Sequence, residues 1–169
     1  MVLHRSLALL LVGLVFPNGA MWAQNQIAGF AGFRWGTTRA AILARFGKPT
    51  EDLSDSTVER LNYVQGPDSG YLFVLSHESG LIAGIRILPR GVGDQCSATV
   101  RADKARITHA LGSLTPVETR TPVVSASSCG GFKEWDVLWR DGEGNRILLS
   151  VDSVKHRLYI SYSSHLVPN

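Results

Sequence analysis

The sequence has few cysteines, no dense run of charge and no long apolar stretch in its interior. Its two cysteines, Cys96 and Cys129, do not form a C-x-x-C pair, which excludes the usual redox motif. The 17 Lys and Arg residues and 14 Asp and Glu residues give a formal net charge of +3 without a basic cluster, so we expect no nucleic-acid partner. The G-x-S-x-G motif of many serine hydrolases is also absent.

The longest apolar run lies at the N-terminus and is too short to span a bilayer comfortably. A basic start, this apolar run and a proline-containing tail that ends in small residues follow one another over residues 1–23. That order is typical of a secretory signal peptide, with cleavage after Ala23 or after Ala20. We therefore expect a periplasmic or secreted protein with no stable membrane insertion after cleavage.

Both cysteines follow this segment, and an oxidising compartment favours a disulfide between them. Cys96 and Cys129 are 33 positions apart, and closing such a loop would stabilise the fold by about 3 to 4 kcal/mol in the chain-entropy model. A metal site is disfavoured because the histidines are scattered without metal-ligand spacing. We expect no metal and no cofactor.

Residues 35–49 (WGTTRAAILARFGKP) predict a short helix. Thr37 or Thr38 can cap its first turn, and Gly47 with Pro49 can end it. Three strands, separated by turns rich in Gly and Ser, are predicted over residues 58–65, 71–77 and 81–88.

The same order recurs further along the chain. A second helix, opened by Ser97 or Thr99, ends at Gly112. Three further strands are predicted over residues 133–140, 145–151 and 157–163.

This recurrence predicts an α+β fold of two tandem units, each a short helix followed by a three-stranded antiparallel meander. The first unit would span residues 24–92 and the second residues 93–169. The second unit carries an insertion rich in Ser, Thr and Pro, which we expect to form a long loop at residues 113–132. A Cys96 to Cys129 disulfide would tie this loop to the start of the second helix.

The phrase WGTTRAAILARFGKP, followed by LNYV, a strand pair and a second such unit, resembles the helix-then-meander repeat of the β-lactamase inhibitory protein family. It is also similar to the single unit of the small lipoprotein in the outer-membrane β-barrel assembly complex. The lipidation cysteine of that lipoprotein is absent here, and the second copy has LGSLTP where the first has FGKP. The resemblance implies a fold that binds proteins on its sheet face and has no chemistry of its own.

Alternation along the predicted strands separates a core face from an outer face. In residues 133–140, Trp135 and Trp139 share the face that we assign to the core. A sheet covered by helices on one side would present these residues on the other: Asn62, Arg86, Asp136, Arg140 and Tyr159. Tyr and Arg are favoured interface anchors, so this is our candidate partner-binding face. An ordinary solvated sheet face is the alternative.

Two groups of residues offer weaker catalytic interpretations. A Ser and His group near the C-terminus lies on one strand and does not by itself build a triad: Ser161, Ser163, Ser164 and His165. An acidic group suits a glycosidase, although solvated strand and turn charges explain it more simply: Glu134, Asp136, Asp141 and Glu143. We assign no catalytic residue.

We therefore expect an exported, non-catalytic module that binds another envelope or secreted protein. One alternative is an inhibitor or immunity protein against a secreted hydrolase, and another is a small secreted hydrolase. A deep polar pocket with convergent titratable groups would favour the hydrolase, whereas a shallow sheet surface with Tyr and Arg would favour binding.

Overall fold

The computed structural model of the protein describes residues 26–66, 69–88, 93–122, 129–152 and 157–167. The described residues begin with a short hairpin of two strands, β1 (Gly29–Phe30) and β2 (Phe33–Arg34), which have two residues each. The first helix and the strands after it are α1 (Arg39–Phe46), β3 (Glu51–Ser54), β4 (Val58–Gly66), β5 (Ser69–Ser76) and β6 (Gly80–Ile87). The second helix and its strands are α2 (Gly93–Leu111), β7 (Val117–Pro122), β8 (Phe132–Arg140), β9 (Arg146–Asp152) and β10 (Arg157–Ser163).

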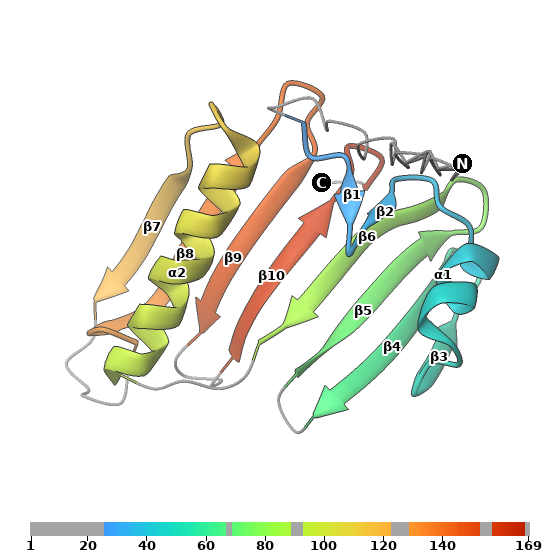
Figure 1. The fold of residues 1–169 in the computed structure, drawn as a ribbon, viewed down its shortest axis with the longest axis horizontal. Helices are drawn as coiled ribbons and strands as arrows, with labels where there is room; N and C mark the ends of the chain where they lie inside the picture. The colour runs from blue at the N-terminus through green and yellow to red at the C-terminus, as the bar shows by residue number, and fades with distance from the viewer. Residues whose placement is uncertain (1–25, 67–68, 89–92, 123–128, 153–156, 168–169) are drawn as a thin grey trace, which may run out of the picture.

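Eight of these strands form one antiparallel sheet in the order β3-β4-β5-β6-β10-β9-β8-β7. Both helices and the β1–β2 hairpin lie against the same face of that sheet (Figure 1). Within the described residues, neither helix is both long and apolar enough to span a membrane. The expected signal peptide, residues 1–23, lies outside the described residues.

The expected fold class, two tandem units of one helix and a three-stranded meander, is wrong. The structure is mostly β, and eight of the ten strands in the described residues join into one sheet through the pairing of β6 with β10. Two strands of this sheet were not expected, and they form its two edges. All four residues of β3 are exposed, so no apolar alternation marks it in the sequence. The other edge, β7, occupies part of the loop expected at residues 113–132.

The first helix begins and ends at residues that the sequence indicated. Thr38 is its N-cap and accepts a hydrogen bond from the backbone N–H of Ala41. Gly47 follows the helix with φ +78°, and its N–H donates to the Leu43 carbonyl at 2.8 Å. Glycine adopts this left-handed conformation without steric cost. The second helix begins at Gly93, about one turn before the expected start at Ser97.

Each helix buries one apolar side against the sheet. In α1, Ile42 is fully buried in a cluster that includes Leu61 and Phe73 of neighbouring strands. In α2, Val100 is fully buried in a second cluster that includes Trp139 of β8. Alternate residues of the strands therefore face the helices.

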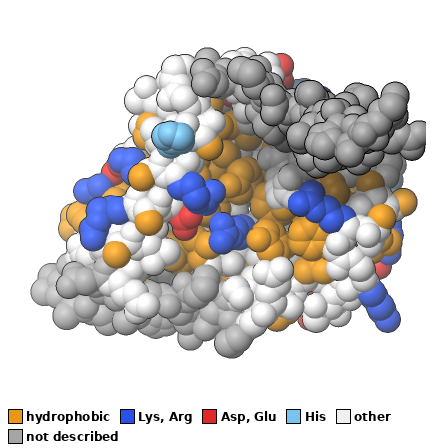
Figure 2. Space-filling view, viewed as in Figure 1, with side chains coloured by type: hydrophobic (Ala, Val, Ile, Leu, Met, Phe, Trp, Pro, Cys, Tyr) orange, Lys and Arg blue, Asp and Glu red, His pale blue; other side chains and the backbone are white. Residues whose placement is uncertain are grey.

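The two apolar clusters meet at the centre of the sheet. Trp35 and Tyr162 pack against both of them, and the Trp35 indole N–H donates to the Ile27 carbonyl at 2.6 Å. Seen from the helix side, Figure 2 shows apolar side chains between the two helices with Lys and Arg side chains around them. The core is therefore continuous through both halves of the chain.

A glycine in β6 lets the N-terminal hairpin close over this junction. A Cβ atom on Gly84 would lie 2.0 Å from the ring of Phe30. That ring contacts Phe73 and Tyr162, with centroid separations of 5.2 and 5.1 Å. Phe30 thus fills the space above β6 that a side chain would otherwise take.

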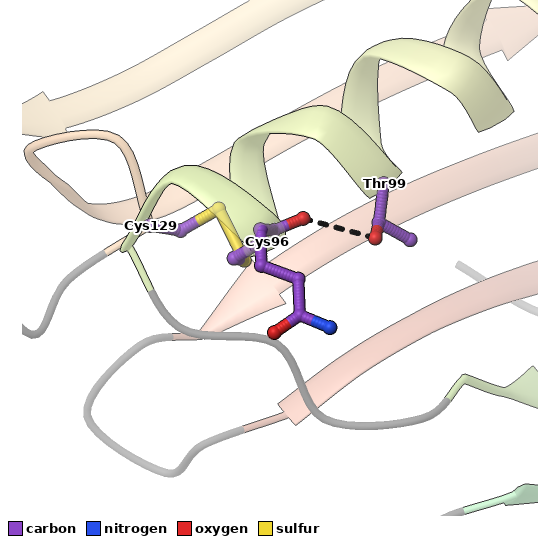
Figure 3. Close-up of a disulfide and its surroundings, with 4 residues drawn as sticks. Cys96, Thr99 and Cys129 are labelled. Atoms are coloured by element: carbon purple, nitrogen blue, oxygen red, sulfur yellow. Dashed lines mark hydrogen bonds between the residues drawn. A yellow bond between two sulfur atoms is a disulfide. The ribbon is translucent and has the colours of Figure 1, made fainter.

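Cys96 and Cys129 form the disulfide that the sequence predicted, with a Cα–Cα distance of 5.2 Å. The bridge joins the first turns of α2 to the segment just before β8, and Figure 3 shows it beside the hydrogen bond from Thr99 to the Gln95 carbonyl. Both cysteines are buried. The bridge therefore closes the loop that contains β7.

Candidate functional site

The sheet face turned away from the helices is the candidate functional surface, and we call it the open face. In β8, Trp135, Val137 and Trp139 are buried on the helix side, so Asp136 and Leu138 between them belong to the open face. The strand register extends this assignment to the other seven strands, because directly paired residues lie on the same face.

One row of mainly apolar residues crosses the open face. Successive register pairs connect β5, β6, β10, β9, β8 and β7 through Leu72, Ile85, Ser161, Leu148, Leu138 and Val117. We call this set the apolar row. Asn62 of β4 pairs with Leu72 and continues the row toward the β3 edge. The row shows that the open face differs from a fully solvated sheet surface, which would carry polar residues at most of these positions.

The most exposed large apolar residues of the strands also lie on the open face. Val117 is 63% exposed, Leu53 is 55% exposed, Val64 is 54% exposed and Ile87 is 40% exposed. Their register partners, or the buried neighbours on either side, place all four on this face. Within the described strands, the helix side carries no large apolar residue of comparable exposure. The open face is thus the apolar surface that the fold leaves uncovered.

Four of the five residues predicted for the binding face lie on the open face. Tyr159, Ser150 and Asp136 are successive neighbours across β10, β9 and β8, and the Ser150 hydroxyl donates to Asp136 at 2.5 Å. Arg140 is exposed at the end of β8. Asn62 donates to Glu51 at 3.1 Å, while its own Oδ1 is buried without a partner among the described residues.

Arg86 is the exception, because it lies on the helix side. It pairs with Tyr71 and with Ile160, and both of these belong to the helix face. Counting alternate residues from the buried Leu81 puts Arg86 on the open face, but Ile82 is an extra residue between Leu81 and Ala83, so the alternation reverses there. The sequence does not mark this bulge.

Arg86 instead belongs to a charged group beside α2. Burial raises the pKa of Tyr162, while the nearby guanidinium groups of Arg106 and Arg86 act in the opposite direction. Arg106 also pairs with Asp103 of the same helix at 2.8 Å. This group lies across the sheet from the candidate binding face.

Sequence reasoning missed the apolar row, although a signal for it is present. Residues 71–75 (YLFVL) and 81–87 (LIAGIRI) are apolar without strict alternation, which indicates strands with apolar residues on both faces. Leu138 interrupts the polar face of residues 133–140 in the same way. These interruptions were the available evidence for an apolar open face.

Several of the residues considered for catalysis make structural contacts or are buried. His165 contacts Asn145, with Nδ1 to Oδ1 at 3.2 Å, and Ser164 is buried. Asp141 is buried at 6% exposure, contrary to the expectation of a solvated turn charge, whereas Glu143 is exposed. Among the described residues there is no group of three or more His, Cys, Asp or Glu side chains able to hold a metal ion.

Comparison with protein-family models gives no match, and comparison with curated proteins gives none. Among solved structures, the chain is similar to an extracellular protein containing a SCP domain from Bacillus anthracis str. Ames, with 12% identity and a TM-score of 0.42. The match covers 77% of this chain and 44% of that one, so the chain spans less than half of that structure. A likeness at this level supports no argument about fold or function. The resemblance to the β-lactamase inhibitory protein family stays a prediction.

Proposed function

We propose that the protein is an exported, non-catalytic module whose open face binds another protein of the cell envelope or a secreted protein. The N-terminal segment, residues 1–23, supports export. The disulfide between Cys96 and Cys129 supports it independently, because disulfides persist in oxidising compartments. No cofactor is part of this proposal.

The observation that carries the proposal is the concentration of exposed apolar side chains on one sheet face. An apolar patch with a polar rim is typical of a protein interface. Here the apolar row crosses the middle of the sheet, while Asn62 and Arg140 supply polar groups toward its margins. Tyr159 lies next to Ile87 on the same face, and Tyr is a frequent energetic anchor in interfaces.

Site-specific photo-crosslinking tests which face meets a partner. A photoreactive residue at Ile87 reports on the open face, and the same residue at the exposed His109 of α2 reports on the helix side. We expect a discrete crosslinked protein from position 87 in intact cells and none from position 109. Equal crosslinking from both positions, or a product from position 109 alone, would contradict the proposal.

Tyr159→Ala then tests the open face with the purified partner. We expect the affinity to fall by about 2 kcal/mol, which is roughly a thirtyfold rise in Kd, with nearly unchanged stability. Trp139 is fully buried and donates to Thr108 at 3.2 Å, so Trp139→Ala should instead cost about 3 to 5 kcal/mol of folding free energy. If Tyr159→Ala binds normally, the open face is not the interface.

A further inference from the structure

A pocket of about 480 Å³ lies on the helix side of the sheet, between α2 and strands β7 and β8. The pocket is lined by Ser97, Arg101, Lys104, Arg120, Gly130, Phe132 and Trp135. Figure 2 shows Lys and Arg side chains gathered over this end of the molecule. The pocket is separate from the open face, which lies on the other side of β8.

The pocket has an excess of positive charge. Arg101, Lys104 and Arg120 line it, and Glu118 is the one acidic residue of the described chain that pairs with any of them. Glu118 accepts hydrogen bonds from Lys104 and, at 2.6 Å, from Arg120. Among the described residues, three cations of the pocket face one carboxylate, and exposed Arg101 has no ion pair with any of these residues. Such a site attracts anions.

A buried hydroxyl group in the pocket also lacks a partner. Ser97 is 4% exposed, and its Oγ forms no hydrogen bond with any described residue. A buried polar group without a partner is costly to the fold, so its presence calls for an explanation. A bound acceptor group would satisfy the hydroxyl.

Glycine at position 130 lies directly against this buried hydroxyl at the base of the pocket. A Cβ atom on Gly130 would lie 2.1 Å from the Ser97 Oγ. The φ angle of Gly130, +57°, is also one that other residues rarely adopt. Any side chain at this position would therefore occupy the space in front of the serine.

Aromatic rings form another part of the wall. The Arg120 guanidinium lies 4.1 Å from the centre of the Trp135 ring and 5.1 Å from that of the Phe132 ring. These contacts hold the guanidinium beside an apolar surface. The volume also exceeds what a bare ion needs and is within the range of small-molecule sites.

We propose that this pocket binds a small organic anion, in which a phosphate or carboxylate group is attached to a flat apolar body. The anionic group is recognised by Arg101, which has no ion pair with a described residue, and by the Ser97 hydroxyl, which has no hydrogen bond with one. The apolar body is recognised by the partly buried Phe132 ring and by the Arg120 guanidinium, which covers the buried Trp135 ring. This inference does not rest on the proposed function of the open face.

The disulfide assembles the pocket. Cys96 immediately precedes Ser97, and Cys129 immediately precedes Gly130. The bridge therefore holds two segments that are distant in sequence against each other at the base of the site (Figure 3).

Calorimetric titration of the purified protein with phenyl phosphate, benzoate and inorganic phosphate tests the proposal. We expect saturable binding of phenyl phosphate or benzoate, with the tighter of the two identifying the anionic group, and weaker binding of inorganic phosphate. Arg101→Gln and Ser97→Ala should each weaken binding about tenfold, since each removes a hydrogen bond to a charged group. Ser97→Ala should retain the melting temperature, because its hydroxyl has no partner to lose.

Arg140→Gln is the matched control, because it makes the same charge change at an exposed position on the open face. We expect its binding curves to equal those of the unmodified protein. A loss equal to that of Arg101→Gln would show a general charge effect and overturn the proposal. So would the absence of saturable binding for all three probes, or inorganic phosphate binding as tightly as phenyl phosphate.

Discussion

Asp141 connects three separate parts of the chain through one buried carboxylate. It accepts hydrogen bonds from the backbone N–H groups of Ile27, Glu143 and Asn145 at 2.8 to 3.0 Å. The Asn145 side-chain amide also donates to Asp141, and the Asn145 Oδ1 accepts a hydrogen bond from the backbone N–H of His165. The N-terminal segment, the β8–β9 turn and the C-terminal segment are thereby joined.

Removing this carboxylate should destabilise the protein strongly. We expect Asp141→Ala to lower the free energy of unfolding by about 2 to 4 kcal/mol, because buried donors lose their acceptor. Glu143→Ala, in the same turn but exposed, should change it by less than about 0.5 kcal/mol. Urea denaturation of both variants measures the difference. Similar losses in the two variants would show that the turn as a whole, rather than the Asp141 carboxylate, carries the stability.

At the scale of the elements, the sequence predicted best where local signals coincide with tertiary packing. Thr38 and Gly47 bound α1 as expected, and the six apolar strands were placed correctly because they contribute buried residues. The edge strands β3 and β7 were missed because almost all of their residues are exposed. Their positions depend on pairing with β4 and β8, which short-range periodicity does not report.

For the candidate binding face, the sequence placed four of the five named residues on the correct side of the sheet. Alternation placed Asn62, Asp136, Arg140 and Tyr159 correctly on one face, since their strands pair without a bulge at those residues. Arg86 was misplaced because the register shift in β6 arises from pairing with β5. The anion pocket was not predicted at all, because Ser97 and Gly130 approach each other only in the folded chain.

The disulfide should contribute at this scale to both stability and ligand binding. We expect the double variant Cys96→Ser and Cys129→Ser to be less stable by about 3 to 4 kcal/mol, from the greater entropy of its unfolded chain. It should also bind phenyl phosphate more weakly than the oxidised protein at a temperature where both are folded. Thermal denaturation and calorimetric titration measure the two effects. Unchanged stability would show that the bridge does not constrain the unfolded chain.

The ion pairs of Glu118 should make the contact between α2 and β7 sensitive to acid. Hydrogen bonding by Lys104 is the main cause that lowers the pKa of Glu118 below its ordinary value of 4.5. The folded state therefore binds this proton less readily than the unfolded state, so the stabilisation is present above about pH 4.5 and is lost as the pH falls through the folded-state pKa.

We accordingly expect Glu118→Gln to be less stable than the unmodified protein at about pH 7, with the difference decreasing toward about pH 3. Urea denaturation across this range measures it. Glu134→Gln, an exposed acid on neighbouring β8, is the control and should show a smaller dependence. A destabilisation by Glu118→Gln that is constant with pH would mean that the ion pairs are not its cause.

At the scale of the whole molecule, the centre of the sheet joins residues that are far apart in the chain. β6 pairs with β10 over five register pairs from Tyr159–Ile87 to Ser163–Ala83. Beyond this ladder, the Leu88 N–H donates to the Leu158 carbonyl at 3.0 Å. Tyr162 packs against both apolar clusters from this position. Neither half of the sheet therefore has a complete core without the other.

The fragment of residues 24–92 should consequently fold poorly on its own. It retains α1 and β3 to β6 but lacks β10, so β6 becomes an unpaired edge and the ring of Phe30 loses its contact with Tyr162. A four-stranded sheet with one eight-residue helix also buries a smaller fraction of its surface than the full chain does. We expect a broad, weakly cooperative thermal transition for the fragment and a sharp one for residues 24–169, both followed by near-ultraviolet circular dichroism. A sharp transition in the fragment would show that its own cluster suffices for folding and that the β6–β10 pairing joins two independent domains. Adding residues 93–169 as a separate chain should restore cooperativity if the missing pairing is the cause, because β10 would again cover β6.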